Sequence, residues 1–113
     1  MKRITTEEYQ DFTLSTWIGN DSSTESELRL VCGMAEESGE VAGKIKKWYR
    51  GDFGDDADRF RSDLQAEMGD LLWYVAMLHN LYDMTLEETM IMNVEKLLDR
   101  QSRDKIQGSG DVR

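Results

Sequence analysis

Two acidic motifs that lie within apolar helical patterns constrain the fold of this chain more than any other feature. They span residues 36–40 (EESGE) and 67–70 (EMGD). On a helix, Glu67 would lie between Leu64 and Leu71 on an apolar stripe, because positions three or four apart share a face. An unpaired carboxylate there would lose much of its hydration at a large cost in free energy. The pattern therefore predicts two helices whose carboxylates converge on a shared cation.

The candidate metal ligands are one pair of carboxylates from each motif. They are Glu37 and Glu40 in the first motif and Glu67 and Asp70 in the second. Within each pair the two side chains lie one turn apart on one face of a helix. Hard divalent cations are the natural partners of a cluster made only of oxygen ligands. We therefore expect a Mg²⁺ site, with Mn²⁺ as the alternative ion.

Apolar periodicity and helix-capping signals divide the chain into four helical segments. Capping boxes begin at Thr5, Thr24 and Thr85. The expected helices span about residues 5–18, 24–50, 60–78 and 85–101. The chain contains no proline, and residues 19–23 and 51–58 are polar and contain glycine, so we expect breaks or flexible connections there. These features predict an all-α fold.

Length, charge and cysteine content exclude several classes of protein. A chain of 113 residues is expected to form one domain over residues 1–113. The formal net charge of −9 argues against binding to long nucleic acid, which depends on basic contacts with phosphates. The single Cys32 excludes an intrachain disulfide, and no apolar run approaches the roughly 18 residues of a membrane span. The N-terminus lacks a signal-peptide pattern, so we expect a cytoplasmic, soluble chain that carries its mature start.

Clusters of basic residues remain despite the acidic total. One group follows the first motif and the other lies near the C-terminus: Lys44, Lys46, Lys47 and Arg50, then Lys96, Arg100, Arg103 and Lys105. They could contact a short polyphosphate that metal ions bridge to the protein, or serve only as a solubilising surface and as cations at helix C-termini. Residues 103–113 show no periodicity, so we expect an extended tail, either frayed or contacting phosphates.

The two motifs resemble the EExxE and ExxD pattern of MazG-type nucleoside triphosphate pyrophosphohydrolases, an all-helical superfamily shared with dimeric dUTPases. The resemblance extends to residues 71–74 (LLWY), 93–97 (NVEKL) and 108–111 (GSGD), and it covers the chain from about Tyr9 to the C-terminus. It implies a four-helix MazG-like bundle with an extended C-terminal tail. It also implies assembly as a homodimer or a dimer of dimers.

The same resemblance implies an activity. Such enzymes hydrolyse nucleoside or deoxynucleoside triphosphates between the α and β phosphates, which yields the monophosphate and pyrophosphate and suits house-cleaning of the nucleotide pool. By this resemblance the catalytic residues are Glu36, Glu37, Glu40, Glu67 and Asp70. The last four would coordinate Mg²⁺, and Glu36 would assist a metal-bound water. Phosphoryl transfer mainly needs charge neutralisation and in-line positioning, so no protein nucleophile is required.

Further residues are candidates for contact with a nucleotide. The expected substrate-binding residues are Lys47, Tyr74, Asn93 and Lys96. Tyr74 stands one turn after Asp70, where its ring could stack on a base or pack in the core. The same alternatives hold for the three tryptophans, Trp17, Trp48 and Trp73, although aromatics at helical spacing are more often core. His79, the only histidine, is interpreted as a packing or surface residue.

A second class of function is compatible with the same fold. The chain could be a helical oligomerisation or regulatory module without activity, although the intact carboxylates argue against it. A ferritin-like di-iron site is excluded because no histidine follows a glutamate by three residues. An EF-hand calcium loop at residues 51–58 is excluded because the ligand order and the terminal glutamate are missing. Base and sugar preference are not set by the four carboxylates.

Overall fold

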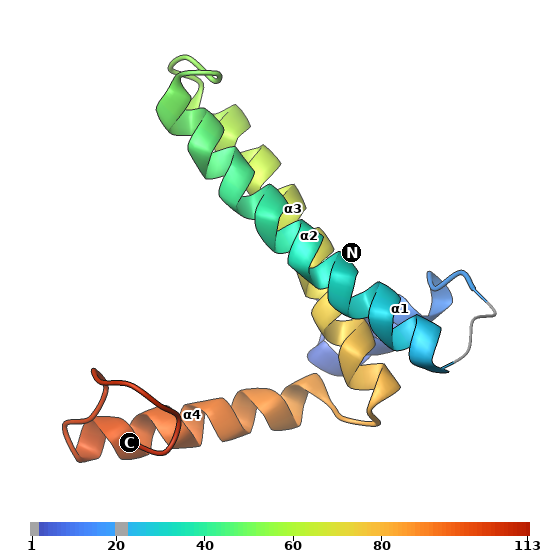
Figure 1. Cartoon of the computed structure of the whole chain (residues 1–113), viewed down its shortest axis with the longest axis vertical. Coiled ribbons are helices and arrows are strands. Elements are labelled where there is room, and N and C mark those ends of the chain that lie inside the picture. Colours follow the sequence, from blue (N-terminus) through green and yellow to red (C-terminus); the bar gives the residue numbers. More distant parts are fainter. Residues whose placement is uncertain (1–2, 20–22) are drawn as a thin grey trace.

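The computed structural model describes residues 3–19 and 23–113, and within these it contains four helices and no strand (Figure 1). The helices are α1 (Thr6–Ser15), α2 (Ser23–Arg50), α3 (Ala57–Leu81) and α4 (Leu86–Ser102). The predicted all-helical fold class is confirmed. None of these helices combines the length and the apolar character that a membrane crossing requires.

Side-chain caps fix the starts of three helices. The Thr5 hydroxyl accepts a hydrogen bond from the Glu8 backbone N–H at 3.1 Å, and the Glu8 carboxylate accepts one from the Thr5 N–H at 3.3 Å, which completes a capping box. Asp56 caps α3, and Thr85 caps α4 by accepting from the backbone N–H of residue 88. Each cap satisfies a backbone donor that has no partner within its helix.

Several helix boundaries differ from the sequence prediction. The helix α3, expected at about residues 60–78, spans Ala57–Leu81 and so is three residues longer at each end. The helix α2 already includes Ser23, so Thr24 lies within its first turn and is not the capping residue. Residues 20–22 of the expected break lie outside the described residues. The helix α1 ends at Ser15 because the hydroxyls of Ser15 and Thr16 donate to carbonyl oxygens one turn earlier, at 2.6 and 2.8 Å. Such side-chain bonds compete with continuation of the helix.

The helices α2 and α3 pack along their length as an antiparallel hairpin (Figure 1). Their connection is anchored by aromatic rings rather than being a loose polar loop. Trp48 stacks on Phe60 with 4.8 Å between ring centroids, and Phe53, buried in the loop, meets Phe60 edge-on at 5.5 Å. Positive φ angles at Gly51 and Gly54 allow the tight turn that brings Phe53 back onto the helices.

A polar network joins α1, α3 and the start of α4. The buried Gln10 amide donates to the Asn80 side chain at 2.9 Å and to the Met84 carbonyl at 2.7 Å, and its oxygen accepts from the Leu86 N–H at 2.9 Å. Beside it, buried His79 contacts the Val75 carbonyl and the Thr89 hydroxyl through its two ring nitrogens, at 2.8 and 2.7 Å. Of the two alternatives for His79, packing or surface, the structure shows packing.

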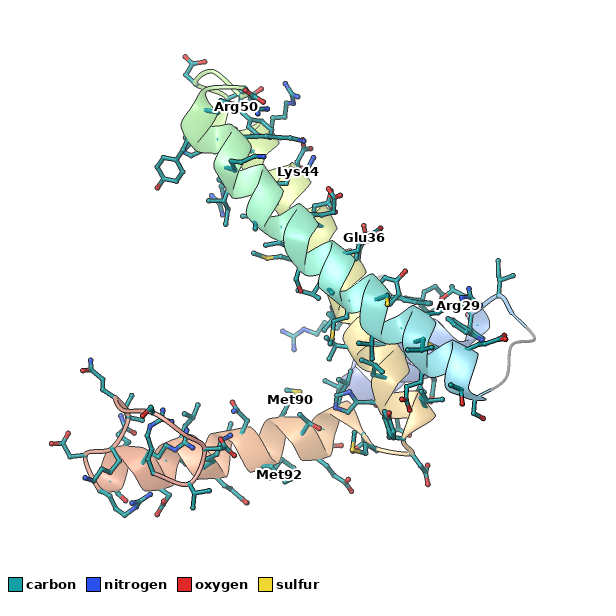
Figure 2. The ribbon with its side chains drawn as sticks, in the orientation of Figure 1. Arg29, Glu36, Lys44, Arg50, Met90 and Met92 are labelled. Carbon is teal, nitrogen blue, oxygen red and sulfur yellow. The ribbon has the colours of Figure 1, made fainter. Side chains whose placement is uncertain are left out.

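Beyond this junction, α4 runs away from the α2–α3 hairpin (Figure 1). Its apolar side chains are therefore uncovered in the single chain, as Met90 and Met92 illustrate (Figure 2). Exposed fractions of 40–69% are found at Met90, Ile91, Met92, Val94, Leu97 and Leu98. A surface of this kind is unusual for a monomeric protein.

The segment after α4 folds back onto that helix instead of extending away from it. The Asp111 carboxylate accepts from Lys96 Nζ at 2.7 Å and from Arg100 Nη2 at 3.1 Å, and the Arg100 side chain is buried. These two cations lower the pKa of Asp111 through hydrogen bonds and charge. The Arg103 guanidinium adds a bond to the Arg113 carbonyl at 2.9 Å. The expectation of an extended tail is therefore wrong. Ion pairs hold the tail against α4, and no periodic pattern in the sequence predicts such pairs.

Candidate functional site

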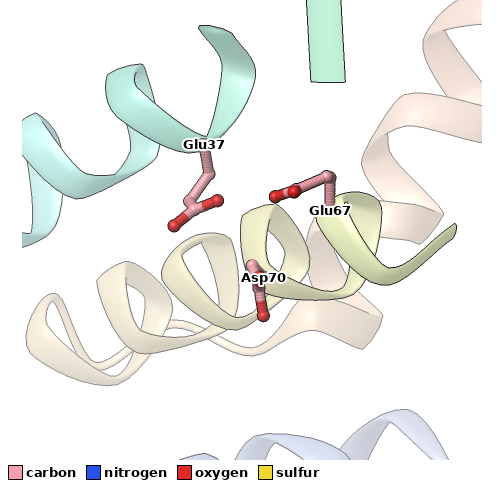
Figure 3. Close-up of side chains that lie close together, drawn as sticks. All are labelled: Glu37, Glu67 and Asp70. Carbon is pink, nitrogen blue, oxygen red and sulfur yellow. The ribbon is translucent and has the colours of Figure 1, made fainter. Parts of the chain in front are cut away.

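The facing surfaces of α2 and α3 bring together carboxylates from both acidic motifs (Figure 3). One oxygen each from Glu37, Glu67 and Asp70 lies within 4.8 Å of the other two. Glu37 and Glu67 are half-buried and Asp70 is exposed at the edge of the helix pair. Three of the four predicted ligands therefore converge, as expected from their one-turn spacing and their position on the packed faces.

The electrostatic cost of this arrangement appears at Glu37. Burial raises the pKa of Glu37 above its ordinary value, and the negative charges of Asp70, Glu67 and Glu36 raise it further. The pKa of Tyr9 on α1 is also raised, first by burial and then by the charge of Asp70. A cation near these oxygens would remove this mutual repulsion.

Lys44 is the basic residue that the structure places against the carboxylates. Its ammonium lies 3.8 Å from a Glu67 oxygen, too far for a good hydrogen bond, and both side chains are about one-fifth exposed. Sequence reasoning grouped Lys44 with other basic residues and did not assign it to the site. Its position seven residues after Glu37, two turns along the same face, is the signal that could have identified it.

The donor set matches a hard divalent cation. All three groups offer carboxylate oxygens, which Mg²⁺ and Mn²⁺ prefer, and no cysteine or histidine takes part. Ligands on opposite sides of Mg²⁺ lie about 4.2 Å apart, given metal–oxygen distances of about 2.1 Å. The spacing of up to 4.8 Å therefore needs only small side-chain rotations to close around an ion.

The remaining acidic residues of the first motif lie beside this cluster rather than in it. Glu40 is exposed on α2 and is not part of the three-carboxylate group. Glu36 is also exposed on α2 (Figure 2), and its charge contributes to the raised pKa of Glu37. Both residues stay predictions for the site.

Of the predicted substrate-binding residues, Tyr74 lies at the cluster. Together with Glu37, Asp70 and Trp73 it lines an open pocket of about 380 Å³, which we call the carboxylate pocket. Lys47 is half-buried near the end of α2.

Asn93 and Lys96 lie elsewhere in the single chain. They line a pocket of about 340 Å³ on α4 with Asp111 from the tail. Because α4 runs away from the hairpin, the structure does not bring these two residues to the carboxylates of their own chain (Figure 1). The Lys96 ammonium already pairs with Asp111 at 2.7 Å.

Comparison with known proteins gives a consistent family. The family model described as "MazG nucleotide pyrophosphohydrolase domain" matches residues 25–103, which include both acidic motifs. Among curated proteins, the "Gene 37 protein" of Mycobacterium phage L5 is 43% identical over 95 residues, which cover 84% of this chain and 83% of the relative. No solved structure matches the chain.

Proposed function

Because the chain belongs to the MazG nucleotide pyrophosphohydrolase family, we propose that it hydrolyses nucleoside or deoxynucleoside triphosphates to the monophosphate and pyrophosphate. The observation that carries this proposal is the convergence of Glu37, Glu67 and Asp70 at the positions of the family's two acidic motifs. This activity would remove unwanted nucleotides from the nucleotide pool.

In this proposal Glu37, Glu67 and Asp70 would hold Mg²⁺, and Glu40 would complete the set from the next turn of α2. A bound divalent cation would polarise phosphate oxygens and lower the pKa of a bound water. The Glu36 carboxylate would take a proton from the attacking water. A phosphorus–oxygen bond between the α and β phosphates would break, and the monophosphate and pyrophosphate would leave.

Phosphate contacts in the proposal come from basic and amide side chains. Lys47 would act as a point charge near the end of α2, and Lys44 would move from Glu67 toward the phosphates when a cation binds. Tyr74 lines the carboxylate pocket and would contact the nucleotide there. Asn93 and Lys96 would reach the phosphates from α4 of a second copy, since α4 leaves its own hairpin.

We therefore propose a homodimer or a dimer of dimers. Association would cover the exposed apolar side chains of α4, which the single chain leaves open. Light scattering at micromolar concentration should give at least twice the 13.1 kDa of one chain. A value of 13.1 kDa would contradict both the assembly and the role of Asn93 and Lys96 at a second copy's site.

The experiment that tests the proposed function is a nucleotide panel with product identification. Pyrophosphate release should require Mg²⁺ or Mn²⁺, should stop with a chelator, and should be accompanied by monophosphate rather than diphosphate. Canonical and damaged nucleotides belong in the panel because the carboxylates do not set base preference. An assembled, correctly folded protein that turns over none of them would instead support the silent oligomerisation or regulatory module.

A further inference from the structure

A second pocket of about 190 Å³ adjoins the carboxylate pocket. It is lined by Thr16, Trp17, Ile18, Arg29, Trp73 and Tyr74, and we call it the aromatic pocket. Trp73 and Tyr74 line both pockets, so they form a wall common to the two. These residues lie one helical turn, about 5.4 Å, beyond Asp70 on α3.

We propose that the aromatic pocket binds the base of the nucleotide, with Trp73 as its stacking surface. This inference rests on the proposed function, because it assumes that the triphosphate lies at the carboxylates next door. Proteins that bind single-stranded nucleic acids stack bases on aromatic rings, and any base can stack in this way because every base has a π face.

The structure separates the tryptophans into two environments. Trp48 packs between Phe53 and Phe60 at the closed end of the hairpin, with ring-centroid distances of 6.5 and 4.8 Å, so it is a core residue. Trp17 and Trp73 lie on the opposite side of the carboxylate cluster from Trp48. Both line the aromatic pocket. All three tryptophans lie in apolar helical patterns of the sequence, but Trp17 and Trp73 line a pocket, whereas the Trp48 ring packs on two phenylalanine rings.

The Trp73 ring is held in a fixed orientation. Its indole N–H donates to the Thr16 hydroxyl at 2.7 Å, which satisfies the polar edge of the ring. The Trp17 ring stacks against it at 6.2 Å, and the Tyr74 ring meets it edge-on at 4.9 Å. The Arg29 guanidinium lies 4.6 Å from the centre of the Trp17 ring. Both tryptophan rings have two such neighbours, but Trp73 lines the carboxylate pocket as well as the aromatic pocket, which makes it the better platform for a base next to the carboxylates.

Gly33 sets the position of the common wall. A Cβ atom at Gly33 would lie 2.2 Å from Cε1 and 2.4 Å from Cζ of Tyr74, so the tyrosine ring rests directly on the α2 backbone. Those distances are far shorter than any contact between non-bonded carbon atoms. The atoms that would clash belong to an aromatic ring, which can move only as a rigid unit. A larger residue at position 33 would therefore displace the Tyr74 ring, which lines both pockets. Gly33 is a positioning residue, whose effect on binding acts through Tyr74.

Equilibrium binding separates a base contact from a phosphate contact. The ligands are a deoxynucleoside triphosphate with a methylene group between its α and β phosphates, which cannot be cleaved there, and inorganic triphosphate, both with Mg²⁺. Trp73→Leu should weaken binding of the nucleotide roughly 5- to 100-fold, the range expected for loss of one stacking contact. Its affinity for inorganic triphosphate should stay within about twofold of wild type. Trp73→Phe keeps a ring and should recover most of the loss.

Two further variants keep the test decisive if Trp73→Leu does not fold. Gly33→Ala should weaken nucleotide binding more than triphosphate binding, with a normal helical circular dichroism spectrum. Trp48→Phe, the matched control, changes a tryptophan outside both pockets and should bind both ligands like wild type. If Trp73→Leu and Gly33→Ala bind the nucleotide like wild type, or lose both ligands equally, the base-binding assignment is overturned. If wild type binds neither ligand, the proposed function itself fails.

Discussion

Replacing Asp70 with Asn should lower the rate of pyrophosphate release at least about a thousandfold and should leave the protein folded. The carboxylate is one of three that converge within 4.8 Å, and loss of a ligand charge removes several kcal/mol of transition-state stabilisation from a metal-assisted reaction. Glu67→Gln should have a similar effect on rate. Both variants are measured by pyrophosphate release at saturating Mg²⁺ and by thermal melting in chelator.

Stability should move in the opposite direction from activity. Without metal, each substitution removes repulsion among the three carboxylates, so the melting temperature should stay the same or rise. The gain should be largest for Glu37→Gln, because burial and neighbouring charges already raise the pKa of Glu37. It should be smaller for Glu67→Gln, which also removes the partner of Lys44 at 3.8 Å.

A matched control lies two turns before Asp70 on the same helix. Asp63→Asn makes the same chemical change as Asp70→Asn, but Asp63 is outside the carboxylate group and pairs only loosely with Arg59 at 4.0 Å. Its rate should equal that of wild type. Glu40→Gln decides whether the fourth predicted ligand belongs to the site, since a large loss of rate would place it there. Wild-type turnover in Asp70→Asn or Glu67→Gln would remove those residues from the site.

The sequence was sufficient where the signals are local. Thr5 and Thr85 cap helices because each hydroxyl accepts a hydrogen bond from the backbone N–H three residues later. This contact is local and does not depend on the rest of the chain. The convergence of Glu37 with Glu67 follows from one-turn spacing on two apolar stripes that must pack together. The pattern at Thr24 misled because a capping-box sequence also occurs one residue inside a helix that has already begun.

Long-range features left no periodic signal. The direction of α4 could not be predicted from the sequence. Apolar residues that remain exposed in a single chain have the same helical spacing as apolar residues that are buried. The Gln10 amide joins residues about seventy positions apart, and single polar side chains carry no pattern that reveals such partners. The same holds for Asp111, which fastens the tail to Lys96, and for Gly33, whose importance depends on the ring of Tyr74.

Millimolar Mg²⁺ should raise the melting temperature of the chelator-treated protein at pH 7 by several degrees. A ligand that binds only the folded state stabilises it by about 2.7 kcal/mol when its concentration is a hundred times the dissociation constant. The stabilised state here is the one in which the carboxylates lie together, since the unfolded chain has no preformed site. Equal ionic strength from NaCl controls for screening of the net charge of −9.

The pH dependence of this effect has a defined sign. The pKa of Glu37 is raised in the folded state above its ordinary 4.5, so the folded protein binds a proton more tightly than the unfolded chain. The stability that this proton contributes is complete below the unfolded pKa and is lost as pH rises through the folded pKa. Asp111 has a lowered pKa, so its contribution is lost only as pH falls through the folded value, below its ordinary 3.8. The raised pKa of Glu37 therefore makes the metal-free protein less stable at neutral pH than at a pH below the ordinary pKa of 4.5.

Metal and protons compete for the same oxygens, so melting curves with and without Mg²⁺ should separate at pH 7 and converge as the carboxylates protonate. The rate of pyrophosphate release should fall over the same acidic range. Glu37→Gln should abolish the Glu37 part of the pH dependence in chelator and should reduce the Mg²⁺-induced rise in melting temperature, because one ligand charge is gone. Asp63→Asn should keep both. A melting temperature indifferent to Mg²⁺ at pH 7, in protein verified to be metal-free, would show that the carboxylates facing each other across α2 and α3 do not bind the ion.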